Sequence, residues 1–262
     1  MSLTRMSVRA ATVLALTNYY SAPWPTMARG RVFDSLIDPI QGAKKDDLIP
    51  SITVYTDDDV GNPLSENNGG PPFRREVTMS MWLTIGQMGE DDDVGDQTLV
   101  LPQTDAQLEA MLDLFEYQVR FCFANYQNKW SRLMTGLFTR VNSWKSDRLA
   151  TEANVRLAAR NITAIVELCD DDVPDAILSG ETGAPLPEGV QRVVDAVAAE
   201  EDPPRGGIHQ TIELMQSATV PTTLTFERLR TIWLRDTHPR DEVADKAVSD
   251  KPIAPTDDLY PG

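Results

Sequence analysis

A nine-residue alternation of apolar and polar side chains constrains the fold more than any other feature of the sequence. Val77, Met79, Met81, Leu83 and Ile85 occupy one set of alternate positions. Successive side chains of a strand point to opposite faces of its sheet, so this pattern predicts a long strand with one buried face. Residues 49–56 form a second run rich in β-branched side chains, and we expect the two strands to pair as an antiparallel hairpin.

One helix is predicted before this hairpin in the sequence, and another is predicted after it. Apolar residues recur at helical spacing in residues 8–20, where prolines then prevent continuation. They recur again from Leu108 to Phe123, with Thr104 as a candidate N-cap and Gln107 three residues later, as in a capping box.

Two further strands are predicted after the second helix. Residues 136–144 alternate as a strand, and residues 143–150 are interpreted as a polar connection. The apolar residues of 155–168 fit both the spacing of a helix and the alternation of a strand. Their β-branched side chains favour a strand, with a bulge near Arg160. Residues 28–48 are irregular and indicate a short buried turn. The predicted fold class is α+β, with a mostly antiparallel sheet flanked by helices.

The charge of the chain excludes one broad class of function. Asp and Glu number 40 against 24 Lys and Arg, a net charge of −16. Such a chain repels phosphate groups, so general polynucleotide binding is not expected. Between Asp170 and Arg205, ten acidic residues accompany two basic ones in a Pro- and Gly-rich stretch. Smaller acidic clusters at 57–59 and 90–93 are interpreted as solvated turns.

This change in composition divides the chain into three predicted parts. Residues 1–170 form an α+β domain, and residues 171–206 form an acidic insert or linker that contains a short helix at 189–201. Residues 207–262 form a helical extension with two amphipathic helices, IHQTIELMQS and TFERLRTIWLR. An extended tail follows Asp236.

Catalytic motifs are not found in the sequence. Cys122 and Cys169 stand in apolar surroundings and are predicted to be buried, reduced residues. His209 and His238 have no zinc-ligand spacing, and neither GxSxG nor a phosphate-binding loop is present. We therefore expect a protein that is not an enzyme and has no cofactor. The alternative is a metal-dependent hydrolase that uses the acidic loops at 57–59 or 91–93. We expect no export signal and no membrane anchor.

Two groups of residues are candidates for an interface. The first is a basic segment interleaved with Trp130, Phe138 and Trp144, a pattern that suits either nucleic acid or, more commonly, an acidic face of a neighbouring subunit. Its cations are Arg120, Lys129, Arg132, Arg140, Lys145 and Arg148. The second is the aromatic segment YYSAPWP, in which Tyr20 and Trp24 lie on an irregular backbone and suit either an interface or local packing.

The order of these elements resembles that of the tail terminator (tail completion) proteins of long-tailed bacteriophages. The positions that match are a P-x-I-x-V strand, an Arg-Glu-led strand, a long amphipathic helix and a closing strand, and the resemblance covers residues 8–170. In this sequence they are Pro50, Ile52 and Val54, then Arg75 and Glu76, then residues 108–123 and 160–168.

The resemblance implies a structural virion protein without catalytic residues. It implies a homohexameric ring on the head-proximal end of the tail tube, assembled in the bacterial cytoplasm. The implied partners are the tail tube protein and the head-completion or stopper protein, and the genomic DNA would pass through the ring without sequence-specific binding. Another neck or tail-tube adaptor protein is the alternative, because the residues after Asp170 exceed what most such proteins carry.

Overall fold

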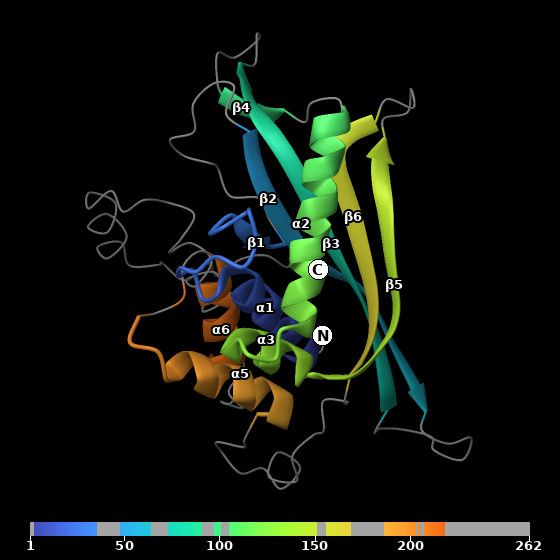
Figure 1. Cartoon of the computed structure of the whole chain (residues 1–262). Helices are drawn as coiled ribbons and strands as arrows, with labels where there is room; N and C mark the ends of the chain where they lie inside the picture. Colours follow the sequence, from blue (N-terminus) through green and yellow to red (C-terminus); the bar gives the residue numbers. More distant parts are fainter. Residues whose placement is uncertain are drawn as a thin grey trace, which may run out of the picture. The chain divides into compact units, whose positions relative to one another are not determined.

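Figure 1 shows the computed structural model of the chain, which describes residues 3–35, 48–63, 73–90, 97–100, 105–150, 156–168, 186–202, 204 and 207–217. All of these belong to one compact unit, Met1–Pro221. The second unit, Thr222–Gly262, lies outside the described residues. The predicted helix TFERLRTIWLR and the predicted tail fall in that unit.

A mixed sheet forms one layer of this unit. Its strands are β1 (Val32–Asp34), β2 (Leu48–Pro63), β3 (Phe73–Glu90), β4 (Gln97–Val100), β5 (Phe138–Ala150) and β6 (Arg156–Leu168). The strand order is β1-β2-β3-β6-β5, and β4 pairs with one end of β3. Only β1 and β2 are parallel among these pairs. The predicted α+β fold with a mostly antiparallel sheet is therefore confirmed.

The β2–β3 hairpin confirms the strongest pattern in the sequence. The five alternating apolar residues of β3 are fully buried beneath the helices. The prediction of a turn at residues 57–59 was wrong, because β2 continues through them after a register shift between Thr56 and Asp59. Contacts with β3 keep these acidic residues in the strand: Arg75 forms an ion pair with Asp59, and the hydroxyl of Ser80 donates to Asp57.

Helix α1 (Leu3–Thr17) lies at the centre of the core, with 11 of its 15 residues buried. Its buried hydroxyl groups donate to backbone carbonyls one turn earlier, as Thr12 does to Val8 at 2.7 Å and Thr17 to Val13 at 2.8 Å. Such back-bonding satisfies the hydroxyls within the helix, and the hydroxyl of Thr12 also contacts the sulfur of Met79 on β3 at 3.4 Å. The small residues of α1 thus allow other elements to pack closely around it.

Helices α5 (Glu188–Ala198) and α6 (Gly207–Ser217) pack on α1, and both were predicted. The carboxylate of Asp34 in β1 joins these parts, because it forms an ion pair with Arg9 of α1 and accepts a hydrogen bond from Thr211 of α6 at 2.6 Å. Divisions were predicted after residues 170 and 206. The described residues on both sides of them share one core.

Helix α2 (Ala106–Ala124) lies across the front of the sheet over β3 and β6 (Figure 1). Its N-cap is Asp105 and not Thr104, since the carboxylate of Asp105 accepts the N–H of Leu108 at 2.8 Å. Thr104 itself lies outside the described residues. Helix α3 (Lys129–Thr135) was not predicted; Asn128 caps it by accepting two backbone N–H groups.

Strand β5 departs most from its predicted form. It continues to Ala150 through residues 143–150, so the prediction of a polar connection was wrong. Three register shifts against β6, before Arg140, before Ser143 and before Ala150, disturb the alternation that identifies a strand. The bulge predicted near Arg160 affects only the pairing with β5, because β6 pairs with β3 in continuous register there. Residues 32–34, predicted as part of a turn, form β1.

Candidate assembly surfaces

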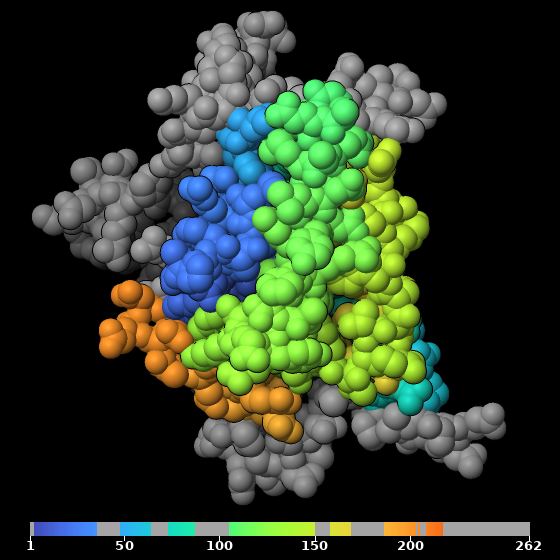
Figure 2. All heavy atoms as spheres, viewed as in Figure 1, coloured from blue at the N-terminus to red at the C-terminus, as the bar shows by residue number. Residues whose placement is uncertain are grey.

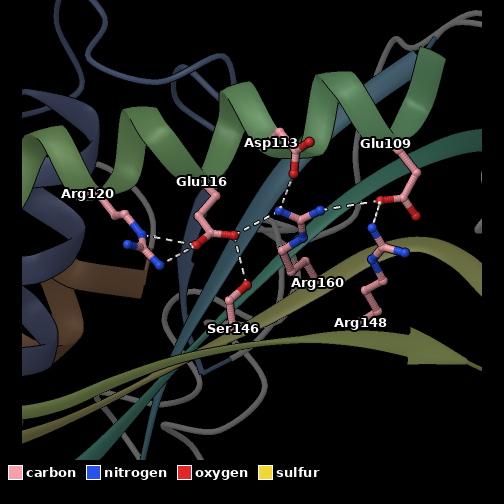
Figure 3. Close-up of polar contacts among 7 residues, drawn as sticks. All are labelled: Glu109, Asp113, Glu116, Arg120, Ser146, Arg148 and Arg160. Carbon is pink, nitrogen blue, oxygen red and sulfur yellow. Dashed lines mark hydrogen bonds and ion pairs between the residues drawn. The ribbon is translucent and has the colours of Figure 1, made fainter. Parts of the chain in front are cut away.

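A network of charges with a buried centre joins α2 to strands β5 and β6 (Figure 3). Its centre is Arg160 on β6, whose side chain is only 7% exposed. The guanidinium group donates to Glu116 at 2.8 Å, to Asp113 at 2.7 Å and to Glu109 at 3.3 Å. These three acidic residues recur along one side of α2, which is how a single arginine contacts all of them.

The network fixes the charge of its members. Burial acts to raise the pKa of Glu116, but hydrogen bonds from Arg160, Ser146 and Arg120 outweigh it and hold that pKa below its ordinary value. Burial likewise acts to lower the pKa of Arg160, and its contacts with Glu116 and Asp113 raise it instead. Glu116 and Arg160 therefore remain ionised at neutral pH, and the network ties the helix to the sheet.

Five of the six predicted interface cations have acidic partners within the subunit. Arg120 pairs with Glu116, Lys129 with Glu200, Arg140 with Glu167, Lys145 with Asp147 and Arg148 with Glu109. Arg132, exposed on α3, has no ion pair with a described residue. Acidic residues of the same subunit thus neutralise most of the charge of the basic segment.

The aromatic residues between these cations pack inward. Trp130 is 4% exposed, and Phe138 and Trp144 pack against the core. Phe123 stacks on Phe138 and meets Trp144 edge-on, with ring centroids 5.0 Å apart. Rings held in this way do not offer free faces for stacking on bases.

The N-terminal aromatic segment is divided between core and surface. It forms a turn in which Asn18, Tyr19 and Tyr20 have positive φ, and Tyr19 stacks on Trp130 with centroids 4.7 Å apart. Tyr20 packs against the core and donates to the carbonyl of Val32 at 3.3 Å. Trp24 remains 37% exposed. Of the two predicted residues, only Trp24 is presented on the surface.

The most apolar exposed surface was not among the predicted sites. Leu114, Tyr117 and Phe121 are 51%, 64% and 51% exposed on the outer side of α2. Ala110 and Ala124 extend the same line, and these five residues are here called the α2 stripe. Figure 2 shows α2 running along the surface between the N-terminal segment and β5. An exposed apolar line of this kind marks an interaction surface.

The sequence carries a signal for the α2 stripe. The core side of α2 is already accounted for by residues such as Leu112, Phe115 and Val119. Leu114, Tyr117 and Phe121 remain, and their positions on the helix point away from the core side. A second apolar line on a helix whose core side is already complete is available to a partner.

The chemistry-bearing residues form no catalytic arrangement among the described parts of the chain. No group of three or more His, Cys, Asp or Glu residues there is placed to hold a metal ion. Asp57 and Asp59 have partners on β3, and residues 91–93 lie outside the described ranges. Burial raises the pKa of the Cys122 thiol to about 12, as fits a core residue. His209 lies beside Glu213, whereas Cys169 and His238 are not described.

Comparison of the chain with protein-family models and with curated proteins finds no match. Among the helices that the structure describes, none combines the length and apolar character that crossing a membrane requires.

Proposed function

We propose that the chain is a structural subunit of a ring at the head-proximal end of the tail tube of a long-tailed bacteriophage. In this role it ends tube polymerisation and joins the tail to the head-completion or stopper ring. It acts as a homohexamer in the virion and catalyses no reaction. Another neck or adaptor protein would differ from it in partners alone.

The arrangement of the described elements is the observation that supports this proposal. An N-terminal helix, a long antiparallel hairpin, a long helix and a closing strand follow one another in the order on which the resemblance rests. A net charge of −16 suits a ring through which DNA slides without adhering.

Electron microscopy of the chain mixed with growing tail tubes tests the proposal. We expect a six-membered ring at one end of each tube and shorter tubes as the chain is added. A chain that remains monomeric at high concentration and never binds tubes would contradict the proposal. Co-purification with the tube protein, or with the portal-side protein instead, separates a terminator from an adaptor.

A matched pair of variants locates the ring contact. Arg132→Gln removes a cation that has no ion pair with a described residue, whereas Lys145→Gln removes one that already pairs with Asp147 at 2.7 Å. If a neighbouring subunit's acidic face binds the basic segment, Arg132→Gln weakens ring closure and Lys145→Gln leaves it unchanged. Ring counts by microscopy measure both.

A further inference from the structure

The α2 stripe has the spacing of a helix–helix seam. Its residues follow one another at intervals of four, three, four and three along the helix. Apolar residues at such intervals stay on one line and interlock with a second helix. The rings of Tyr117 and Phe121 stack on each other with centroids 6.5 Å apart, so the centre of the seam is already ordered in the single subunit.

We propose that a second copy of this chain covers the α2 stripe, with the two α2 helices antiparallel about a two-fold axis. The contact goes beyond the proposed ring and does not rest on it. A two-fold contact joins the same surface of two subunits and closes on itself, so it pairs subunits and does not propagate a ring.

The charges beside the stripe select an antiparallel partner of the same sequence. Asp113 and Arg120 stand seven residues apart on one flank, and their side chains are 68% and 53% exposed. In an antiparallel pair each flank faces the same flank of the other copy, which brings Asp113 of one subunit near Arg120 of the other. In a parallel pair this flank faces the opposite one, where Gln118 and Asn125 carry no charge. Asp113 already contacts Arg160 and Arg120 already contacts Glu116 within the subunit, so the antiparallel arrangement extends these two pairs across the contact, and the parallel one does not.

The sizes of the side chains fit one antiparallel register. With Leu114 of one copy opposite Tyr117 of the other, Ala110 lies opposite Phe121. A small residue thus faces a large one on each side of the centre, which allows the two helices to interlock without a void. The same register leaves Asp113 about 3 Å along the axis from Arg120 of the second copy.

The exposed area is sufficient for a weak, specific pair. Aromatic side chains bury about 150–250 Å² each, so the exposed parts of Leu114, Tyr117 and Phe121 amount to roughly 300 Å² per subunit. A standard interface buries about 800 Å² per partner, and the flanking charges supply part of the remainder. We therefore expect a pair that forms at concentrations of about 10–100 μM.

Cysteine cross-linking of the full chain tests both the partner and its direction. In the proposed register, Ala110→Cys and Phe121→Cys meet when the two variants are mixed, and a mild oxidant links them as a dimer. Each variant alone stays unlinked, because two copies of either position are about 16 Å apart along the axis. The unsubstituted chain is the matched control, because it keeps both native cysteines, Cys169 and the buried Cys122, and so reports any link through the native thiols.

Three results would overturn the proposal. One is the absence of cross-linking in the mixture, and another is self-linking of Ala110→Cys, which signals a parallel pair. The third is a solution mass that stays monomeric up to about 100 μM and does not differ between the unsubstituted chain and Leu114→Glu. We expect instead that Leu114→Glu weakens the pair at least about tenfold and leaves the thermal unfolding of the monomer unchanged. Ring formation on tail tubes is scored separately, so failure of the pair leaves the proposed ring function to its own test.

Discussion

Helix α2 and strand β5 are the two long elements of one segment, Ala106 to Ala150, yet they present opposite kinds of surface. On β5, Arg140, Lys145 and Arg148 are exposed but already neutralised by acidic partners in the same subunit. On α2, the stripe is exposed and apolar, and no described element packs on it.

The difference shows how the subunit controls its contacts. A long edge strand attracts other strands, and β5 opposes this with three register shifts and charged side chains. The α2 stripe has no such protection. Removing it from water lowers the free energy of association, whereas removing the charged surface of β5 from water does not. Clustered charge in this sequence is largely paired within the subunit, whereas the α2 stripe is an apolar line with no place in the core.

The sharpest test of the comparison lies within α2 itself. Phe115 is fully buried and Phe121 is 51% exposed, so the same substitution separates the core side from the stripe. Phe115→Ala is expected to lower the free energy of unfolding by about 3–5 kcal/mol, because it opens a cavity. Phe121→Ala in the monomer should change it by less than about 1 kcal/mol. Urea unfolding at low concentration measures both, and equal losses would mean that the stripe is part of the core.

The charge network centred on Arg160 joins α2 to β5 and β6, and substitution of this arginine tests how much the network stabilises the fold. Arg160→Met leaves Glu116 without its central cation in a nearly buried position, and we expect a loss of about 2–4 kcal/mol in the free energy of unfolding. The loss stays below that of a fully buried pair because Asp113 remains in water. Arg140→Met is the control, since this exposed arginine should cost less than about 1 kcal/mol. Similar losses for the two variants would show that the network adds no stability.

The network also predicts a dependence on pH. The pKa of Glu116 is lower in the folded state than its ordinary value of 4.5, so its contribution to stability is fully present above that value. It is lost as the pH falls through the folded-state pKa. The free energy of unfolding should therefore decrease more steeply below about pH 4.5 in the unsubstituted chain than in Glu116→Gln. Parallel curves from chemical unfolding between pH 3 and 6 would contradict this assignment.

The smallest effect is expected on β5. Arg148 is half exposed and pairs with Glu109 at 3.2 Å, so Arg148→Ala should lower the free energy of unfolding by about 0.5 kcal/mol. The solution mass of the pair that α2 forms should not change. A drop in that mass would place β5 in the contact and remove the distinction between the two surfaces.

The sequence predicts the parts of the fold whose pattern is regular. The alternation on β3 and the helical spacing of α2 come from residues that face a core, and a buried side keeps its period. Strand β5 faces solvent along an edge, and its three register shifts remove the period, so its second half was mistaken for a connection. The acidic run of β2 was mistaken for a turn, because Arg75 and Ser80, which stabilise it, lie on another strand.

The surroundings of the candidate surfaces depend on tertiary contacts that the sequence does not contain. The exposure of Arg140 or Lys145 can be inferred from the sequence, but the pairing of each with an acidic residue depends on strand register. Leu114, Tyr117 and Phe121 look like core residues until the core side of α2 is known to be complete without them. Only the folded structure separates the apolar residues that the core uses from those that it leaves over.

The contacts of α1 with α5 and α6 also set the order in which the subunit can be made. Ser7 contacts Met215, Asp34 contacts Thr211, and Tyr19 contacts Asp202, all across more than 170 positions of sequence. Ribosomes add about 5–20 residues per second, so the first helix emerges roughly 10–40 s before these partners exist. During that time the apolar residues of α1 lack these partners. The core of the subunit closes only after α5 and α6 have been synthesised.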